Sequence, residues 1–217
     1  MFDFSGKKIL ITGASGGIGR DLSKSFLENG ADVIITGTNS EKLTLLNQDF
    51  NFKCKTFECN LSSVDDTNNL IEYLNKSGGV DILINNAGKA GRYAHKGETD
   101  NDISGHDPTG IAEIIETNLC GPYLMLHHAL PHMKKLTRAR VINISKRTES
   151  MHRKAWTPYG PTKAALEAAT IAWAESLSET GVTVNTLSPG GAVNTKFGTG
   201  KISGHGIDPG TIRPMTV

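Results

Sequence analysis

Short apolar runs alternate along the first third of the chain with longer stretches in which apolar residues recur every three or four positions. A short apolar run predicts a strand, and recurrence at that spacing predicts an amphipathic helix. Ser62 or Ser63 is expected to cap the third helix, and Gly30 and Gly78-Gly79 are expected to end helices. The strands are expected at 8–12, 32–36 and 55–58, and the helices at 18–29, 40–49 and 64–76.

The same alternation continues in the rest of the chain, where the apolar runs are nearly uninterrupted. Uninterrupted runs are typical of parallel strands that helices cover on both faces. Strands are expected at 82–85, 141–145 and 183–188, and long helices at 109–136, with a kink at Gly121-Pro122, and at 158–180. The expected fold class is therefore α/β, a Rossmann-type doubly wound parallel sheet of about six strands.

Length and charge narrow the class of protein further. The 217 residues contain no Pro/Ser-rich linker and no charge block, so a single domain over residues 1–217 is expected. The net charge is +1, and positive and negative residues are interspersed, so the sequence contains no basic stretch that would bind nucleic acid or an anionic membrane. The first residues contain no long apolar run that would mark a signal peptide or a membrane span. A cytoplasmic protein without nucleic-acid or membrane partners is expected.

The cysteines and histidines lack the spacing of a metal site. Cys54, Cys59 and Cys120 form no C-x-x-C pair, so buried free thiols are expected rather than disulfides or zinc ligands. His128 and His132 have helical i, i+4 spacing, but no acidic third ligand accompanies them, and both are expected on the surface. No metal is expected.

A glycine turn, Thr12-Gly13-Ala14-Ser15-Gly16-Gly17-Ile18-Gly19, joins the first expected strand to the first expected helix. A dinucleotide pyrophosphate needs backbone N–H groups at a helix N-terminus and no side chains in the way of its approach. The expected cofactor contacts in this turn are Gly13, Ser15, Gly16, Gly17, Ile18 and Gly19.

The segment after the second strand bears on the choice of cofactor. A carboxylate there would bond the ribose 2′-hydroxyl of NAD and repel the extra phosphate of NADP. Thr38, Asn39 and Ser40 offer donors instead, and Glu41 is the nearest charge. NADP is therefore favoured, and NAD remains an alternative.

Tyr159 and Lys163 are four residues apart on an expected helix, so their side chains share a face. A phenol has a pKa of about 10 in water, and a nearby ammonium stabilises the phenolate. Lys163 is therefore expected to lower the pKa of Tyr159, which would suit that phenol to proton transfer.

Several short motifs together resemble the short-chain dehydrogenase/reductase (SDR) family. They are the glycine turn, Asn60 after the third strand, Asn85-Asn86-Ala87-Gly88 after the fourth, Asn118, Tyr159-x-x-x-Lys163 and Pro189-Gly190. Their order and spacing cover nearly the whole chain. Residues 1–88 are in addition similar to bacterial 3-oxoacyl-(acyl-carrier-protein) reductases.

The resemblance implies hydride transfer between a nicotinamide and a carbonyl or alcohol, such as a ketone or a 3-oxoacyl group. It implies that Tyr159 is the general acid or base, that Lys163 also bonds the nicotinamide ribose, and that Asn118 holds a water in the proton path. The cofactor contacts that it adds are Thr38, Asn60, Leu61, Asn86, Ala87, Gly88, Tyr159, Lys163, Pro189 and Gly190.

Lys146 departs from the family pattern, because it stands thirteen residues before Tyr159, where the family has a catalytic serine. Ser145 is expected to supply the hydroxyl instead, because a shift of one residue at the end of the fifth strand could bring it to the carbonyl. Thr148 and Ser150 are alternatives, and an inward Lys146 is another, because a cation also polarises a carbonyl oxygen.

The C-terminal part departs as well, because the family continues to a seventh strand and this chain ends at Val217. The strand at 183–188 is therefore expected to be a sheet edge. A homo-oligomer is expected to form through apolar faces of the two long helices, at 111–126 and 164–177.

A second function remains open, a dinucleotide-binding sensor or scaffold with little or no turnover. Lys146 and the short C-terminal part are the features that favour it. Binding of the dinucleotide without its consumption would distinguish such a protein from an enzyme.

Overall fold

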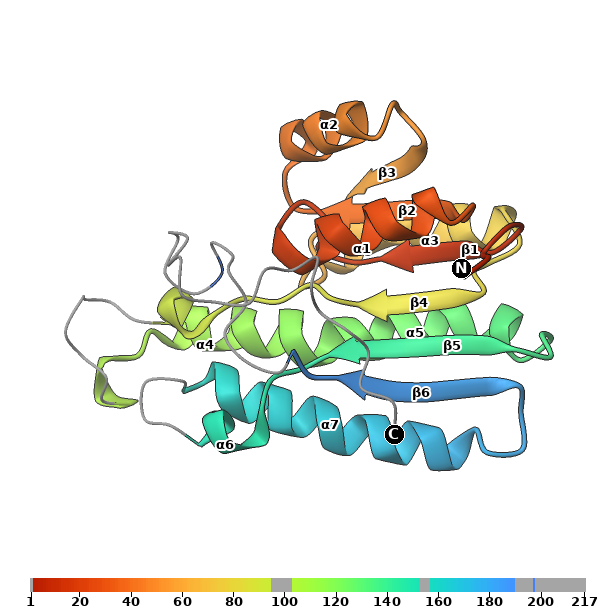
Figure 1. The fold of residues 1–217 in the computed structure, drawn as a ribbon. Coiled ribbons are helices and arrows are strands. Elements are labelled where there is room, and N and C mark those ends of the chain that lie inside the picture. Colours follow the sequence, from red (N-terminus) through yellow and green to blue (C-terminus); the bar gives the residue numbers. More distant parts are fainter. Residues whose placement is uncertain (1, 95–102, 153–156, 190–196, 198–217) are drawn as a thin grey trace.

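Six parallel strands form one sheet in the order β3-β2-β1-β4-β5-β6 (Figure 1). The structure is a computed structural model, and it describes residues 2–94, 103–152, 157–189 and 197. The strands are β1 Lys8–Ile11, β2 Asp32–Gly37, β3 Cys54–Glu58, β4 Ile82–Asn85, β5 Ala139–Ile144 and β6 Val182–Leu187. The expected Rossmann-type α/β class is confirmed.

The helices follow the strands in strict alternation over the first half of the chain. They are α1 Gly17–Glu28, α2 Ser40–Asp49, α3 Val64–Lys76, α4 Pro108–Ile115, α5 Gly121–Met133, α6 Thr148–Met151 and α7 Tyr159–Ser176, with short 3₁₀ turns η1 Gly91–Ala94 and η2 Ile103–Gly105. Side chains cap several of them, because the first N–H groups of a helix lack partners within it. Ser63, rather than Ser62, caps α3 by accepting from Asp66 N, and Asn39 caps α2 by accepting from Lys42 N.

Two apolar layers hold the helices on opposite faces of the sheet. Leu10 belongs to the layer shared with α3, α5 and α7, whereas Ile9 and Ile11 belong to the layer shared with α1 and α2. Adjacent strand residues point to opposite faces, which is why neighbouring positions in β1 serve different layers. All three side chains are fully buried, and each such burial contributes roughly 1.5–3 kcal/mol.

The strand order reverses direction between β1 and β4, because β2 and β3 lie on one side of β1 and β4 to β6 on the other. At such a switch point the loops after the two strands diverge and leave room for a ligand. All strands point to the same edge of the molecule, on the left of Figure 1, where α4 and α6 also lie. Loops from β1, β4 and β5 therefore meet there.

The long helix expected at 109–136 is not continuous. A π-helical turn, η3 Glu116–Cys120, separates α4 from α5. The irregularity thus lies just before the expected kink at Gly121-Pro122, and the proline occupies the first turn of α5, where its missing N–H costs nothing. The π turn matters for the site because it contains Asn118.

Some expectations about burial are wrong. Cys54 and Cys59 are buried, but Cys120, the last residue of the π turn, is exposed. His128 and His132 are half-buried rather than on the surface, because α5 packs that face against the core. Within the described ranges, no group of three or more His, Cys, Asp or Glu side chains is arranged to hold a metal, and no helix is long and apolar enough to cross a membrane.

The two edges of the described sheet are β3 and β6. As expected, β6 pairs on one side only among the strands that the structure describes, and Thr183 and Asn185 on it are exposed. A buried polar chain fastens α7 to the sheet beside it. Asn85 Nδ2 donates to Asn143 Oδ1 at 2.8 Å, and Asn143 Nδ2 donates to Thr170 Oγ1 at 2.8 Å.

Candidate active site

The glycine turn brings the N-terminus of α1 to the end of β1 with little room for side chains. A Cβ on Gly13 would lie 2.6 Å from Ala87 Cα, and one on Gly19 would lie 2.6 Å from Asn86 Nδ2. Gly16 is different, because a Cβ there would meet nothing within 4 Å. Gly13 and Gly19 are therefore needed for packing, and Gly16 faces open space.

The N-terminus of α1 has the features of an anion site. No side chain caps it at Gly16, and its first turn contains no acidic residue. The first N–H groups and the helix dipole then favour a negatively charged group. A pyrophosphate fits this arrangement of residues.

The loop after β4 clamps the glycine turn. Asn86 Nδ2 donates to Thr12 O at 2.9 Å and to Gly13 O at 3.0 Å, while the backbone N–H groups of Asn86 and Ala87 both donate to Thr12 Oγ1 at 3.1 Å. Thr12 is fully buried. This role of Thr12 is not among the expected site residues. Its position directly before Gly13 in the glycine turn is the sequence feature that indicates it.

The expected adenosine-side residues follow β2 and β3. Thr38, Asn39 and Ser40 are exposed at the tip after β2, although the Asn39 side chain oxygen already caps α2. Asn60 Oδ1 accepts from Ser62 Oγ at 2.7 Å. Leu61 is buried, and a Cβ on Gly121 would lie 2.9 Å from Leu61 Cβ.

The side chain of Asn118, in the π turn, bonds to the loop after β4 and to α7. Its Oδ1 accepts from Lys89 N at 2.7 Å, and its Nδ2 donates to Lys89 O at 2.9 Å and to Thr162 Oγ1 at 3.1 Å. The side chain is fully buried, and a Cβ on Gly88 would lie 3.4 Å from its Oδ1. The amide of Asn118 thus joins the loop after β4 to α7.

Tyr159 and Lys163 lie together in the first turns of α7. Tyr159 is 7% exposed and Lys163 3%. Lys163 Nζ donates to Ile144 O at 2.8 Å and lies 5.9 Å from the centre of the Tyr159 ring. The ammonium therefore bridges α7 and the end of β5, directly beside the phenol.

The direction of the Tyr159 pKa shift contradicts the sequence-based expectation. Burial raises the pKa of Tyr159 above its ordinary value, because the phenolate would lose its hydration. Burial also lowers the pKa of Lys163 from 10.5 to about 8, and Glu167 opposes that shift. Loss of hydration outweighs the attraction of an ammonium whose hydrogen bond goes to Ile144 O.

Ser145 and Lys146 point in different directions at the end of β5. Ser145 Oγ donates to Glu167 Oε1 on α7 at 2.7 Å, whereas Lys146 Nζ lies 5.3 Å from the centre of the Tyr159 ring. Both partners belong to α7, but Glu167 lies about two helical turns beyond Tyr159, so the two side chains meet different parts of that helix. This geometry does not fit the expectation for Ser145, since Lys146 takes the place beside the phenol.

The other candidates for the serine position are Thr148 and Ser150. Thr148 is exposed at the start of α6. The side chain of Ser150 and the whole of Gly190 lie outside the described residues, whereas Pro189 is buried just after β6. The ring of Phe197, for which no sequence motif predicted a role, lies 5.5 Å from the ring of Tyr159.

The fold and the glycine turn define an α/β protein of the dinucleotide-binding kind. A model of the short chain dehydrogenase family matches residues 7–204. The chain belongs to the short-chain dehydrogenase family.

Two relatives illustrate the range of the similarity. The L-fucose dehydrogenase of Oryctolagus cuniculus is 31% identical over 188 residues, which cover 86% of this chain and 63% of that protein. The 3-oxoacyl-[acyl-carrier-protein] reductase FabG of Rickettsia typhi is 33% identical over 190 residues, which cover 88% and 74%. This chain thus spans less than two thirds of the length of the L-fucose dehydrogenase.

Solved structures with bound dinucleotides share the fold. A 3-ketoacyl-(acyl-carrier-protein) reductase from Brucella melitensis complexed with NADH is 26% identical, with a TM-score of 0.84 over 96% of this chain and 88% of that one. A metagenomic short-chain oxidoreductase in complex with NADP is 28% identical, with a TM-score of 0.77 over 86% and 83%. These relatives indicate a nicotinamide dinucleotide as the cofactor of the family fold.

Proposed function

We propose that this chain is an oxidoreductase that reduces a carbonyl compound with a nicotinamide dinucleotide, and that Tyr159 is its general acid. One observation carries the proposal, the buried pair of Tyr159 and Lys163. This pair stands at the end of the sheet where the glycine turn and α1 offer a pyrophosphate site.

The dinucleotide would be held along the ends of the first four strands. The N–H groups at the start of α1 suit its pyrophosphate, and Asn60, Leu61 and Asn86 to Gly88 are proposed to line the groove that it crosses. When bound, it supplies the hydride that adds to the carbonyl carbon. Thr38, Asn39 and Ser40 favour NADPH over NADH, because they are donors at a tip without an aspartate or glutamate among them. Comparing kcat/KM for NADPH and NADH tests that preference.

The raised pKa of Tyr159 determines in which form its side chain meets the substrate, because it keeps the phenol protonated. A phenol that burial keeps protonated is ready to donate its proton to a carbonyl oxygen as negative charge develops there. Lys163 stands beside it with its ammonium fixed on Ile144 O. The same ammonium is proposed to hold the ribose, as the family resemblance implies.

Asn118 is proposed as a positioning residue. Its amide fixes the backbone of Lys89 and the hydroxyl of Thr162, and Thr162 lies between Tyr159 and Lys163 on α7. Loss of this amide would leave buried polar groups without partners and would shift the loop after β4 against α7.

A ketone or a 3-oxoacyl group is the proposed substrate, in line with the 3-oxoacyl reductases among the relatives. The test mixes purified protein with NADPH or NADH and a panel of β-ketoesters, diketones and simple ketones, and follows oxidation of the reduced nicotinamide. Tyr159→Phe should lower turnover by about 10²-fold or more, as removal of a general acid does, while cofactor binding persists.

A sensor or scaffold is the competing function, and Lys146 beside the phenol is the observation that favours it. Such a protein would bind the dinucleotide without consuming it on any substrate of the panel. The Tyr159→Phe variant would then behave like the natural chain in every assay.

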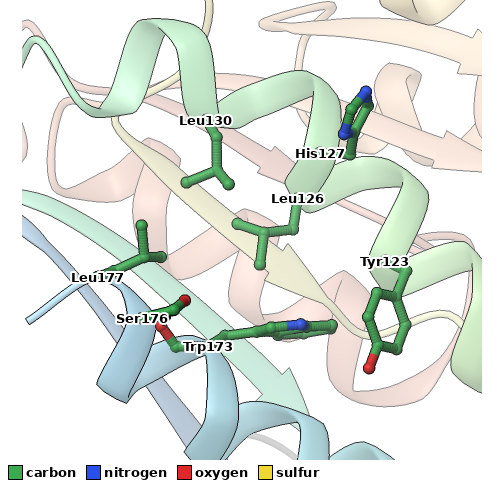
Figure 2. Close-up of a pocket in the computed structure, with 7 residues that line it drawn as sticks. All are labelled: Tyr123, Leu126, His127, Leu130, Trp173, Ser176 and Leu177. Atoms are coloured by element: carbon green, nitrogen blue, oxygen red, sulfur yellow. Dashed lines mark hydrogen bonds between the residues drawn. The ribbon is translucent and has the colours of Figure 1, made fainter.

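A homo-oligomer is proposed through the outer faces of α5 and α7, where Figure 2 shows a shallow apolar hollow. Its lining residues are Tyr123, Leu126, His127, Leu130, Trp173, Ser176 and Leu177. The rings of Tyr123 and Trp173 pack edge to face at 4.5 Å, and Tyr123 remains 48% exposed. An exposed tyrosine packed on a half-buried tryptophan beside an apolar hollow is typical of a surface that another protein copy covers.

A further inference from the structure

Two lysines approach the same phenol from different elements. Lys146 Nζ, at the end of β5, lies 5.3 Å from the centre of the Tyr159 ring, and Lys163 Nζ, on α7, lies 5.9 Å from it. Lys163 is almost fully buried and is fixed on Ile144 O, whereas Lys146 is half-buried. Lys146 is thus the cation that keeps contact with solvent beside the proposed acid.

Three acidic side chains on neighbouring elements have partners within the described part of the structure. Glu113 on α4 pairs with Lys89 Nζ at 2.8 Å, and Glu149 on α6 pairs with Arg147 Nε at 3.6 Å. Glu167 on α7 accepts from Ser145 Oγ at 2.7 Å, and its charge also raises the pKa of Lys163 against the effect of burial. The two ammonium groups at 5.3 and 5.9 Å from the centre of the Tyr159 ring favour negative charge on an incoming molecule.

We propose that Lys146 selects carbonyl substrates whose carboxylate is attached to the reacting carbonyl carbon or to the carbon beside it, that is, 2-oxo and 3-oxo acids, over neutral esters and ketones. The inference rests on the proposed function, since it names the substrate class of the same site. An ammonium bonded to a carboxylate forms a charge-assisted hydrogen bond, whereas a neutral ester offers it an uncharged oxygen.

The reaction balances without a further reagent. A hydride from the reduced dinucleotide forms the new C–H bond, the electron pair of the C=O π bond moves to oxygen, and the phenol proton of Tyr159 goes to that oxygen. The oxo acid is reduced to a hydroxy acid, the dinucleotide is oxidised, and solvent returns a proton to Tyr159. Lys146 stays charged throughout and only holds the carboxylate.

A structural role for Lys146 predicts a different result. If its ammonium merely packs over the aromatic ring, removing the charge changes both members of a matched acid and ester pair equally. If it holds the carboxylate, the change falls on the acid alone and mainly in KM, because the interaction is present before the hydride moves.

The experiment measures kcat/KM of the full chain at saturating NADPH for acetoacetate against methyl acetoacetate, and for pyruvate against methyl pyruvate. Lys146→Met and Lys146→Ser remove the charge, and Lys146→Arg keeps it. Arg147→Met is the matched control, because it removes a neighbouring exposed cation that already pairs with Glu149.

The natural chain should prefer each acid over its ester by about 10- to 100-fold, as expected for one partly solvated charge-assisted bond. Lys146→Met and Lys146→Ser should abolish the preference, and Lys146→Arg and Arg147→Met should keep it. Equal acid-to-ester ratios in the natural chain and in Lys146→Met would overturn the inference.

A binding measurement separates failure of this inference from failure of the proposed function. The nicotinamide fluorescence of the protein–NADPH complex is titrated with 3-hydroxybutyrate and with its methyl ester. Turnover of ketones without any preference for acids contradicts the selection by Lys146 alone. Absence of all turnover contradicts the proposed function, and the selection by Lys146 then stands only if 3-hydroxybutyrate binds more tightly than its ester and Lys146→Met removes that difference.

Discussion

Replacement of Lys163 by methionine tests how strongly a buried ammonium destabilises this fold. Lys163 is 3% exposed, and burial lowers its pKa from 10.5 to about 8. Methionine matches the unbranched side chain and carries no charge. The variant therefore removes the titration of Lys163 and its bond to Ile144 O, and changes little else in shape.

The size of the effect follows from the two pKa values. A difference of about 2.5 between 10.5 and 8, at about 1.4 kcal/mol for each pKa unit, corresponds to about 3 kcal/mol. Because the folded-state pKa is the lower one, the charged form is penalised in the folded chain. This penalty is complete below about pH 8 and disappears as the pH rises toward 10.5.

Between these pH values the unfolded chain binds more protons at Lys163 than the folded chain does, so stability rises with pH. The free energy of unfolding of the natural chain, minus that of Lys163→Met, should therefore increase by about 2–3 kcal/mol from pH 7 to pH 10. The lost hydrogen bond to Ile144 O offsets the difference by an amount that does not depend on pH, and so it does not affect this increase.

The measurement is urea unfolding followed by circular dichroism in a series of buffers over that range, with the natural chain and the variant side by side. Lys53→Met is the control, because Lys53 is exposed and its loss should leave the pH dependence unchanged. A difference between the natural chain and Lys163→Met that stays constant within about 0.5 kcal/mol would refute the reasoning, since it would mean that the ammonium is as well solvated as in the unfolded chain.

Two further predictions concern the glycine turn and the helix face. Gly19→Ala should lower the free energy of unfolding by about 1–3 kcal/mol and abolish NADPH binding, because its Cβ would lie 2.8 Å from Gly13 O, whereas Gly16→Ala should remain within about 0.5 kcal/mol of the natural chain. Thermal unfolding and nicotinamide fluorescence measure both, and equal effects of the two variants would contradict the packing argument. Tyr123→Lys should convert the proposed oligomer to monomers in sedimentation velocity, with Lys53→Met as control, and a natural chain that sediments as a monomer would disprove the interface.

The strands, most helices and the phosphate turn could be predicted from the sequence because each depends on local pattern. An apolar run such as Ile82–Asn85 leaves few conformations other than a buried strand, and the glycines of the turn fix the backbone. The π turn around Asn118 has no such local pattern, because no residue in Glu116–Cys120 is a proline or glycine that would mark an irregular helix.

The pKa of Tyr159 and the placement of Lys146 could not be predicted, because both depend on three-dimensional surroundings. Helical spacing places Lys163 beside the phenol, but it does not reveal that burial outweighs the attraction of the charge. The orientation of Ser145 and Lys146 depends on the residue at which β5 ends, and a shift of one position exchanges their sides.

Burial of the Lys163 ammonium lowers the stability of the fold. It also explains why a site that binds an anionic substrate needs a second lysine. Lys163 is fixed on Ile144 O inside the fold, so its ammonium is placed to act on Tyr159 and on a group held between them. Lys146 reaches the same ring from the strand end while solvent still hydrates it, so it meets a carboxylate without the same loss of hydration. A serine at position 146 would offer one hydroxyl to a carbonyl oxygen and no charge to a carboxylate. We therefore expect a lysine in place of the family's serine at position 146 to change mainly which substrates bind. Its effect on proton transfer from Tyr159 is expected to be smaller.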